Sequence, residues 1–257
     1  MTRGFGIDAS VPRDVAEEVA GLVERAGYDS FWVNGSPHEG ALDIIEATLD
    51  VTDLDVGVGV FPLPKISADE LVAEVRERDL DQHRLWLGVG SGRSPGGLDE
   101  VRQAAHTLRG DLEVKVVTGA VGPRMMAVAG EVADAVVLTW SFVAEVERAQ
   151  GILVESAAAV GREPPPVISF VRCALTPEAD EAIAERAAVY DAIPHYQKVF
   201  ARNGLTAADT VVTGADRSQL LEGIQREESV LDMPVIRAIT PDQTVESFAR
   251  LIEACAP

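Results

Sequence analysis

Apolar residues in this chain follow two spacings, one typical of buried strands and one typical of amphipathic helices. Short runs rich in Val, Ile and Leu, such as residues 54–61 and 84–91, have the length and near-continuous hydrophobicity of parallel strands covered on both faces. By contrast, residues 14–26 place Val15, Val19 and Leu22 on one helical face. Eight strands are predicted, each followed by a helix, at residues 4–9, 29–34, 54–61, 84–91, 112–118, 135–140, 167–175 and 230–239.

Eight β/α units in 257 residues match a (β/α)8 TIM barrel, which belongs to the α/β class. The competing architecture is an open doubly wound sheet, but the turn after the first strand reads Ala-Ser-Val-Pro and lacks the glycine-rich fingerprint of that fold. We expect one domain over residues 1–257, with short loops. Residues 194–225 are the least regular stretch and are interpreted as an insertion between strands seven and eight.

Local signals predict where several helices begin and end. Gly27 is placed to close the first helix in a left-handed conformation. Two capping boxes are predicted, Ser67 with Glu70 and Thr240 with Gln243, each at the start of a helix. The pair Thr176-Pro177 is expected to open the helix after strand seven.

The charge balance restricts the partners of the protein. The chain has 22 Lys and Arg against 42 Asp and Glu, a net charge of −20, so phosphate backbones and anionic lipid are disfavoured as partners. We see neither a secretory signal core nor an apolar run long enough to cross a membrane, and the two cysteines are far apart. These features lead us to expect a cytoplasmic protein.

The carboxyl ends of the strands, where a barrel carries its active site, are poor in reactive groups. They offer no pair of carboxylates, no histidine cluster and no set of metal ligands, so we predict no metal site and disfavour a hydrolase. A barrel mouth of this kind indicates a cofactor that brings the reactive chemistry.

The loop after the fifth strand is the most informative segment of the mouth. It places Gly119 and Gly122 among small side chains, and Pro123 is positioned as the first residue of the next helix. Amides at such a helix start could hold a phosphate, with Arg124 adding a positive charge. An ordinary tight turn between strand and helix is an equally good interpretation.

Glycines also interrupt strands three and four. Gly57 and Gly59 in strand three, and Gly88, Gly90 and Gly92 at the end of strand four, indicate either close approach of a ligand to the backbone or packing room inside the barrel. Together with the fifth loop, they suggest a large flat ligand lying against main chain.

Three segments resemble motifs of the bacterial luciferase-like superfamily. They are residues 24–33 (ERAGYDSFWV), residues 84–92 (RLWLGVGSG) and residues 122–138, which begin Gly-Pro-Arg-Met and continue to AGEVADAVVL. The last is the most specific, and the resemblance is strong over residues 4–175 and looser beyond. Members of that superfamily are barrel enzymes that use FMN or the deazaflavin F420, and this chain is most similar to the F420-using branch.

The resemblance implies roles for particular residues. The ring system of the cofactor would pack over a bulge in strand three, with a non-proline cis peptide at Val58–Gly59 or one bond away. The implied cofactor-binding residues are Asn34, Val58, Gly59, Phe61, Gly90, Ala120, Val121, Gly122, Pro123, Arg124 and Thr139. The resemblance also implies a small-molecule substrate and a homodimer.

The chain departs from the superfamily after strand two, where many members carry an acidic residue followed by His. Here Asn34 replaces the acid and His38 is displaced, although His38 remains the best candidate for a proton donor. Trp32, Phe61 and Trp140 are candidates either for an apolar substrate pocket or for the core. In the insertion, His195 and Tyr196 lie on either a lid or a solvated helix.

Three functions remain open from the sequence. The leading one is an oxidoreductase or monooxygenase that moves hydride between F420, or alternatively FMN, and a small organic substrate. The second is a flavin- or deazaflavin-binding protein without turnover, which the missing acid–His pair favours. The third, an unrelated phosphate-binding barrel such as an aldolase, would need a lysine or paired acids at the mouth, and Lys65 and Lys115 are badly placed for this.

Overall fold

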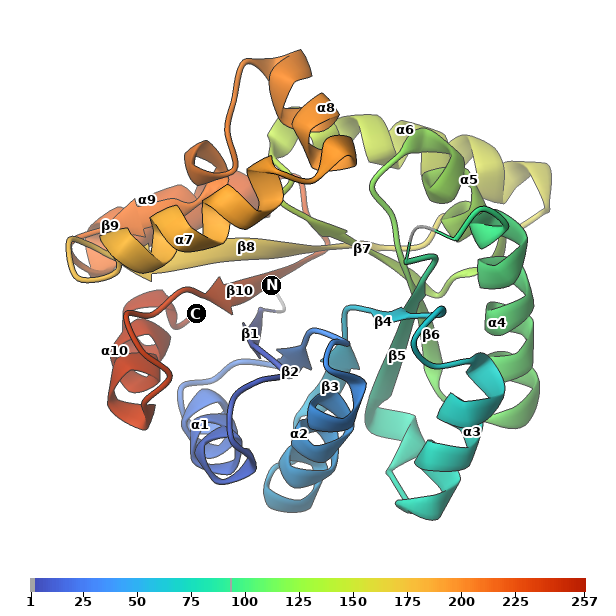
Figure 1. Cartoon of the computed structure of the whole chain (residues 1–257), viewed down its shortest axis with the longest axis horizontal. Helices are drawn as coiled ribbons and strands as arrows, with labels where there is room; N and C mark the ends of the chain where they lie inside the picture. Colours follow the sequence, from blue (N-terminus) through green and yellow to red (C-terminus); the bar gives the residue numbers. More distant parts are fainter. Residues whose placement is uncertain (1–2, 93) are drawn as a thin grey trace.

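The computed structural model describes residues 3–92 and 94–257, over which strands and helices alternate (Figure 1). The strands are β1 (Gly4–Ile7), β2 (Ser30–Val33), β3 (Asp55–Val58), β4 (Phe61–Pro62), β5 (Leu85–Gly90), β6 (Lys115–Gly119), β7 (Ala135–Thr139), β8 (Val167–Leu175), β9 (Val212–Gly214) and β10 (Met233–Ala238). The helices are α1 (Arg13–Arg25), α2 (His38–Val51), α3 (Ala68–Glu77), α4 (Gly97–Asp111), α5 (Pro123–Val132), α6 (Val143–Ala159), α7 (Asp180–Asp191), α8 (Pro194–Asn203), α9 (Arg217–Glu228) and α10 (Val245–Cys255). No helix in this described part of the chain is both long and apolar enough to span a membrane.

The strands close into an eight-stranded parallel barrel, which confirms the predicted fold. Neighbouring strands pair in the order β1, β2, β3, β5, β6, β7, β8 and β10, and β10 also pairs with β1. At the closure Phe5 lies opposite Ile236, and Val235 lies opposite Phe170. An open doubly wound sheet would have two free edges in this series, so the closure excludes that alternative.

The third strand is interrupted, where the sequence predicts one strand over residues 54–61. β3 ends at Val58, and the short β4 begins at Phe61 and pairs only with β5. The peptide bond between Gly59 and Val60 is cis, one bond beyond Val58–Gly59. Gly59 and Val60 therefore leave the strand at the carboxyl end of the barrel.

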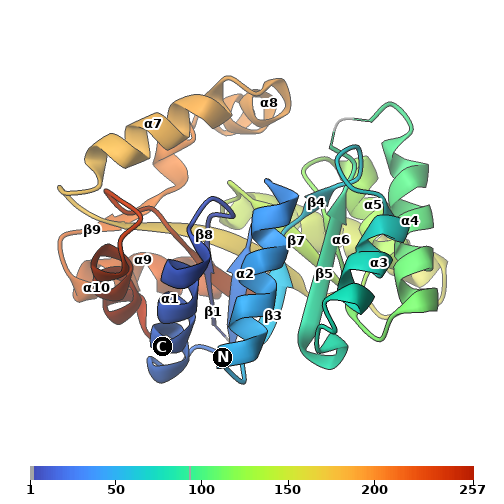
Figure 2. The same ribbon diagram turned by 60° about the horizontal axis from the view of Figure 1, so that its bottom comes forward.

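The segment expected to be irregular, residues 194–225, instead contains α8, β9 and α9. Helix α8 begins with Pro194 in its first turn and ends at Gly204, which has φ +68°. Strand β9 pairs with β8 outside the barrel, with Val212 opposite Cys173. Figure 2 shows α8, next to α7, at the top of the view, above the strands of the barrel. The insertion thus gives the barrel an extra cover.

Two of the predicted helix starts are wrong and one is confirmed. The Ser67 and Glu70 capping box is present at α3. Thr240, by contrast, donates its hydroxyl to the Asp242 carbonyl, and α10 is capped by Thr244, which accepts from the Ser247 amide. After β8, the Thr176-Pro177 bond is cis and the helix begins only at Asp180. Residue type alone did not identify which of several neighbouring hydroxyls caps the helix.

Inside the barrel, Trp32 fills the space that glycines leave on neighbouring strands. Its indole is fully buried, and its Nε1 donates to Ser30 Oγ at 2.9 Å. A Cβ on Gly4 would lie 3.0 Å from Trp32 Cδ1, and one on Gly57 would lie 2.4 Å from Cδ2. Packing room therefore accounts for Gly57, and Trp32 belongs to the core rather than to a substrate pocket.

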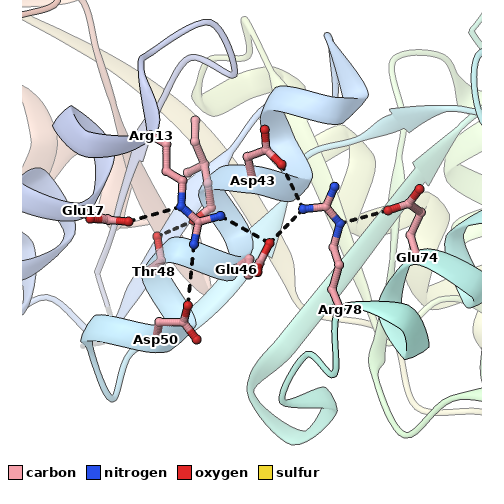
Figure 3. Close-up of polar contacts among 9 residues, drawn as sticks. Arg13, Glu17, Asp43, Glu46, Thr48, Asp50, Glu74 and Arg78 are labelled. Atoms are coloured by element: carbon pink, nitrogen blue, oxygen red, sulfur yellow. Dashed lines mark hydrogen bonds and ion pairs between the residues drawn. The ribbon is translucent and has the colours of Figure 1, made fainter.

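The outer faces of α1, α2 and α3 are joined by ion pairs (Figure 3). Arg13 on α1 and Arg78 at the end of α3 both contact Glu46 of α2, at 3.3 and 2.8 Å. Arg78 also contacts Asp43 and Glu74 at 2.8 and 2.9 Å. These bonds hold the three helices in register around the N-terminal half of the barrel.

Gly57→Ala should lower the free energy of unfolding by about 1–3 kcal/mol, because the added methyl carbon would overlap the Trp32 ring. Gly151→Ala on the exposed face of α6 is the matched control: its Cβ meets nothing within 4 Å, and alanine favours a helix. Urea unfolding followed by tryptophan fluorescence measures the free energy of unfolding of both variants. Equal stability of Gly57→Ala and the wild type would contradict this account of the core.

Candidate functional site

Two cavities open at the carboxyl ends of the barrel strands, where a barrel carries its active site. The smaller has a volume of about 320 Å³ and lies over β1, β2, β8 and β10; the larger, about 710 Å³, lies between the loop after β6 and helix α8. The two share seven lining residues, namely Gly59, Val60, Gly90, Gly92, Thr139, Phe170 and Tyr196. They therefore form two arms of one site.

The floor between the arms is Val60, resting on three glycines. A Cβ on Gly90 would lie 2.7 Å from Val60 Cγ2, and one on Gly119 would lie 2.9 Å from the same atom. A Cβ on Gly88 would lie 2.9 Å from Val60 Cγ1. The glycines of strands β5 and β6 thus make room for one small apolar side chain, which gives the site an apolar floor.

The loop after β6 forms one wall of the larger cavity. Ala120, Val121, Gly122 and Pro123 all line it, and Pro123 is the first residue of α5, as predicted. A Cβ on Gly122 would meet nothing within 4 Å, so the backbone there faces open space. Arg124 does not line this cavity but lines an adjoining groove, together with Arg102, Gly122 and Pro123. This wall can present backbone amides of a helix start to an anion.

Cationic side chains from α6 and α8 form the opposite wall. Arg148, Lys198 and Arg202 line the larger cavity together with His195. The buried Glu145 binds both Arg148 and Arg202, the latter at 2.7 Å. The wall keeps a net positive charge. The positive charge of this arm therefore comes from the insertion and from α6 rather than from Arg124, while Arg93 lies outside the described residues.

Polar side chains from the ends of β1, β2 and β10 meet a side chain of α7 in the smaller cavity. Asp8 Oδ2 accepts from Arg237 at 2.9 Å and from Arg186 of α7 at 3.2 Å. Arg237 also donates to Asn34 Oδ1 at 3.1 Å, and that oxygen accepts from the Ala9 amide at 2.9 Å. Asn34 Nδ2 donates to the Ser36 carbonyl, so this side chain is held in place by its neighbours.

Asp8 is ionised in this arrangement. Burial raises the pKa of its carboxyl, but Arg237 and Arg186 together with the hydrogen bonds from Ser10 outweigh that effect, and the net result is a pKa below the ordinary value. Asp8 is thus an acceptor that orients Arg237, and it is unsuited to donate a proton at neutral pH.

Arg172 lies in the wall of the smaller cavity and is only 6% exposed. Its guanidinium carbon lies 3.6 Å from the centre of the Trp140 ring and 5.3 Å from that of Tyr190, and its Nη2 donates to Thr139 Oγ1 at 2.9 Å. Its Nη1 is buried and has no hydrogen-bond partner among the described residues. Burial, with the nearby Arg237 and Arg186, lowers the pKa of Arg172 to about 9, so it remains a cation at neutral pH.

Several residues implied by the resemblance lie together at the floor and walls. Gly59, Gly90 and Thr139 line both arms, and Asn34 lines the smaller one. Val58 and Phe61, however, are fully buried and line neither arm. The fully buried Phe61 and Trp140, 1% exposed, belong to the core, like Trp32.

The two histidine-bearing segments are placed differently. His38 is the first residue of α2, and its Nε2 lies 3.7 Å from Glu39, outside the residues lining either arm. Tyr196 is 8% exposed and lines both arms, and His195 lines the larger. The lid interpretation of this segment therefore fits better than a solvated helix.

Sequence reasoning assigned no role to the most distinctive groups of the smaller arm, Arg172, Arg186, Arg237 and Tyr190, although Arg172 and Arg237 lie at predicted strand ends. A signal for two of them was present. Arg172 interrupts the apolar run of β8, and Arg237 interrupts that of β10. A charged residue inside a strand that is otherwise apolar, near its carboxyl end, indicates a side chain pointing into the mouth of the barrel.

Asp8→Asn should lower the free energy of unfolding by about 2–3 kcal/mol at pH 7, because it leaves the buried Arg237 without its carboxylate. The pKa of Asp8 is lower in the folded protein, so its contribution is present above the ordinary pKa and is lost as the pH falls below about 4. The difference in the free energy of unfolding between the variant and the wild type, measured by urea unfolding, should therefore shrink from pH 7 to pH 3. The exposed Asp53→Asn is the control, and a difference for Asp8→Asn that did not change with pH would refute this role.

Solved structures with the same fold include enzymes of several kinds. A coenzyme F420-dependent tetrahydromethanopterin reductase from Methanopyrus kandleri is 15% identical, with a TM-score of 0.74 and coverage of 99% of this chain and 98% of that one. An F420-dependent secondary alcohol dehydrogenase in complex with an F420–acetone adduct is 16% identical, with a TM-score of 0.78 and coverage of 98% and 97%. The oxygenating constituent of 3,6-diketocamphane monooxygenase from Pseudomonas putida, in complex with FMN, is 13% identical, with a TM-score of 0.71 and coverage of 100% and 98%. At these identities the likeness establishes the fold.

The sequence comparison establishes more than the fold. The curated proteins contain no match to this sequence. The family model of the luciferase-like monooxygenases, however, matches residues 101–254, which is more than half of the chain. The match includes the motif at residues 122–138 and runs well beyond residue 175, where the resemblance to the superfamily motifs becomes looser. The chain belongs to the luciferase-like monooxygenase family.

Proposed function

We propose that the protein is an oxidoreductase that transfers hydride between the deazaflavin F420, or alternatively FMN, and a small organic substrate. One observation carries the proposal: two arms of a single site meet over the apolar floor at Val60, and one of them ends at the helix start of α5. A long ligand with a planar ring and a phosphate needs both features.

The residues of the larger arm fit the phosphorylated end of such a cofactor. Gly122 leaves open space beside the backbone, and Ala120, Val121 and Pro123 surround the same space. Lys198 and Arg202 stand on the facing wall. The phosphate would be held by amides of the loop after β6 on one side and by these cations on the other.

The bound cofactor would supply the hydride chemistry, and the chain would position the reactants. Val60 lines both arms and would support the ring where they meet, so a substrate in the smaller arm would face it. Tyr196, from α8, borders both arms and covers the junction against water. Burial raises the pKa of its hydroxyl, which therefore stays protonated and can donate a hydrogen bond.

F420 is the preferred cofactor because the larger arm keeps a net positive charge after Glu145 pairs with Arg148 and Arg202. Its charged lining residues are Arg148, Lys198 and Arg202, in a chain of net charge −20. A wall with several cations suits a ligand that carries negative charges beyond a single phosphate, as F420 does with its glutamate tail. Two of the solved relatives in fold are also F420-dependent enzymes, whereas a third binds FMN.

A protein that binds the cofactor without turnover is the second candidate. The position of His38 favours it, because this histidine lies beside Glu39 and outside both arms. Reduced F420 mixed with the protein and a panel of enones, ketones and aldehydes separates the two functions. Oxidation of the cofactor supports the enzyme, and stable binding without oxidation supports the alternative.

Titration of the purified protein with F420 and with FMN tests the cofactor directly. Binding of F420 with a Kd below about 100 µM, tighter than that of FMN, is expected from the cationic wall; a Kd in the millimolar range corresponds to only about 4 kcal/mol. Quenching of flavin or deazaflavin fluorescence gives both constants. Failure of both cofactors to bind would refute the proposed function.

Gly122→Val should weaken cofactor binding at least about tenfold and leave stability nearly unchanged, because the new side chain has free space in the protein but occupies the space of the phosphate. Gly110→Val, at an exposed glycine of α4 whose Cβ also meets nothing within 4 Å, is the matched control and should bind normally. Equal affinities of the two variants would exclude loop 119–123 from the cofactor site.

A further inference from the structure

The smaller arm contains a buried cation that the cofactor proposal leaves unused. Arg172 lines this arm, and its Nη1 is buried without a hydrogen-bond partner among the described residues. A buried donor without a partner costs free energy, and a charged one costs more. The other nitrogen, Nη2, is fixed on Thr139 Oγ1, and the plane of the group lies against Trp140. The guanidinium is thus held in one orientation with one end free.

The charges around Arg172 leave this arm positive. Its charged lining residues are three arginines, Arg172, Arg186 and Arg237, and one carboxylate, Asp8, for a net charge of +2. Asp8 binds Arg237 and Arg186, and no ion pair to Arg172 is formed within the described chain. Since the whole protein carries −20, this is a local concentration of positive charge against the general trend.

We infer that the smaller arm binds the carboxylate of a small organic acid, with Arg172 as its principal partner and Arg186 as a second cation. This inference names the substrate class of the proposed oxidoreductase and rests on that proposed function. A guanidinium with a free end matches the planar, two-oxygen geometry of a carboxylate.

The remaining walls favour an organic acid over inorganic phosphate. Phe170, Tyr190 and Tyr196 bring aromatic rings to the arm, and Phe170 Cζ would lie 2.7 Å from a Cβ on Gly59, close to the floor. Aromatic walls gain from covering an apolar body, which inorganic phosphate lacks. A volume of about 320 Å³ suits a small molecule whose carboxylate is at Arg172 and whose body reaches the Val60 floor.

Binding of three small probes to the cofactor-free protein tests the inference: benzoate, its neutral analogue benzamide, and inorganic phosphate. Calorimetric titration should give binding of benzoate at least about tenfold tighter than that of either other probe. Arg172→Gln should weaken benzoate about ten- to a hundredfold, as expected for loss of a charge-assisted hydrogen bond. Arg186→Gln, at a half-exposed side chain, should weaken it less and should not disturb folding.

Arg76→Gln is the matched control, because it removes the same charge at an exposed pair with Asp111, on the outer face of α3. It should bind benzoate like the wild type. If Arg172→Gln fails to fold, Arg172→Lys, which keeps the charge but loses the fork, together with Arg186→Gln should still lower the benzoate affinity while Arg76→Gln does not.

Three outcomes would overturn the inference. Equal binding of benzoate and benzamide would show that the arm does not select an anion, and tighter binding of phosphate would give it a different ligand class. Displacement of benzoate by F420 or FMN, with loss of cofactor affinity in Arg172→Gln, would assign Arg172 to the cofactor. Because the titration needs no cofactor, its failure is distinguishable from a failure of cofactor binding.

Discussion

The site depends on which side chain each strand can place at the mouth of a closed barrel. Alternate residues of a strand point inward, so each strand offers a single position at the upper layer. On β5 and β6 that position is glycine, and Val60 occupies the vacated space as the floor. On β8 and β10 it is arginine, which gives the other side of the mouth its charge. The same rule therefore produces the apolar floor at Val60 from β5 and β6, and the arginines of the smaller arm from β8 and β10.

Helices α7 and α8, which follow β8, cover part of this mouth and complete its two arms. Helix α7 brings Arg186 and Tyr190 to the smaller arm, and α8 brings Lys198 and Arg202 to the larger one, with Tyr196 at the junction. The Tyr190 ring packs against those of Trp140 and Tyr196, and the Arg172 guanidinium lies over Trp140 and Tyr190, so the cover is attached to the barrel by aromatic packing. The aromatic cover and the Arg172 guanidinium therefore pack together. A ligand bound to Arg172 would lie directly beneath this cover.

The alternation of apolar runs was sufficient to predict the order of strands and helices in the barrel and the position of the loop at residues 119–123. Both features depend on local sequence. The charged site formed by Arg172 and Arg237 in the smaller arm was harder to predict from the sequence. Whether Arg172 has a carboxylate partner depends on where α7 lies, and α7 is positioned by tertiary packing that no local pattern records. His38 shows the reverse case: a histidine two residues from the expected position begins a helix and faces Glu39 instead of the mouth. The cap at Thr244 likewise depended on loop geometry, which hydroxyl spacing alone did not decide.

The contrast between a surface of net charge −20 and two cationic arms has a consequence for how anions reach the site. Acidic side chains repel an approaching anion at long range, and this repulsion is screened over about 10 Å at 0.1 M salt. The attraction by Arg172 acts only within the enclosed arm, where screening is weaker because the group is buried. Added salt therefore weakens the repulsion more than the attraction. The affinity for a small acid should accordingly rise slightly with ionic strength, whereas it would fall for a protein whose anion site lies on an exposed basic surface.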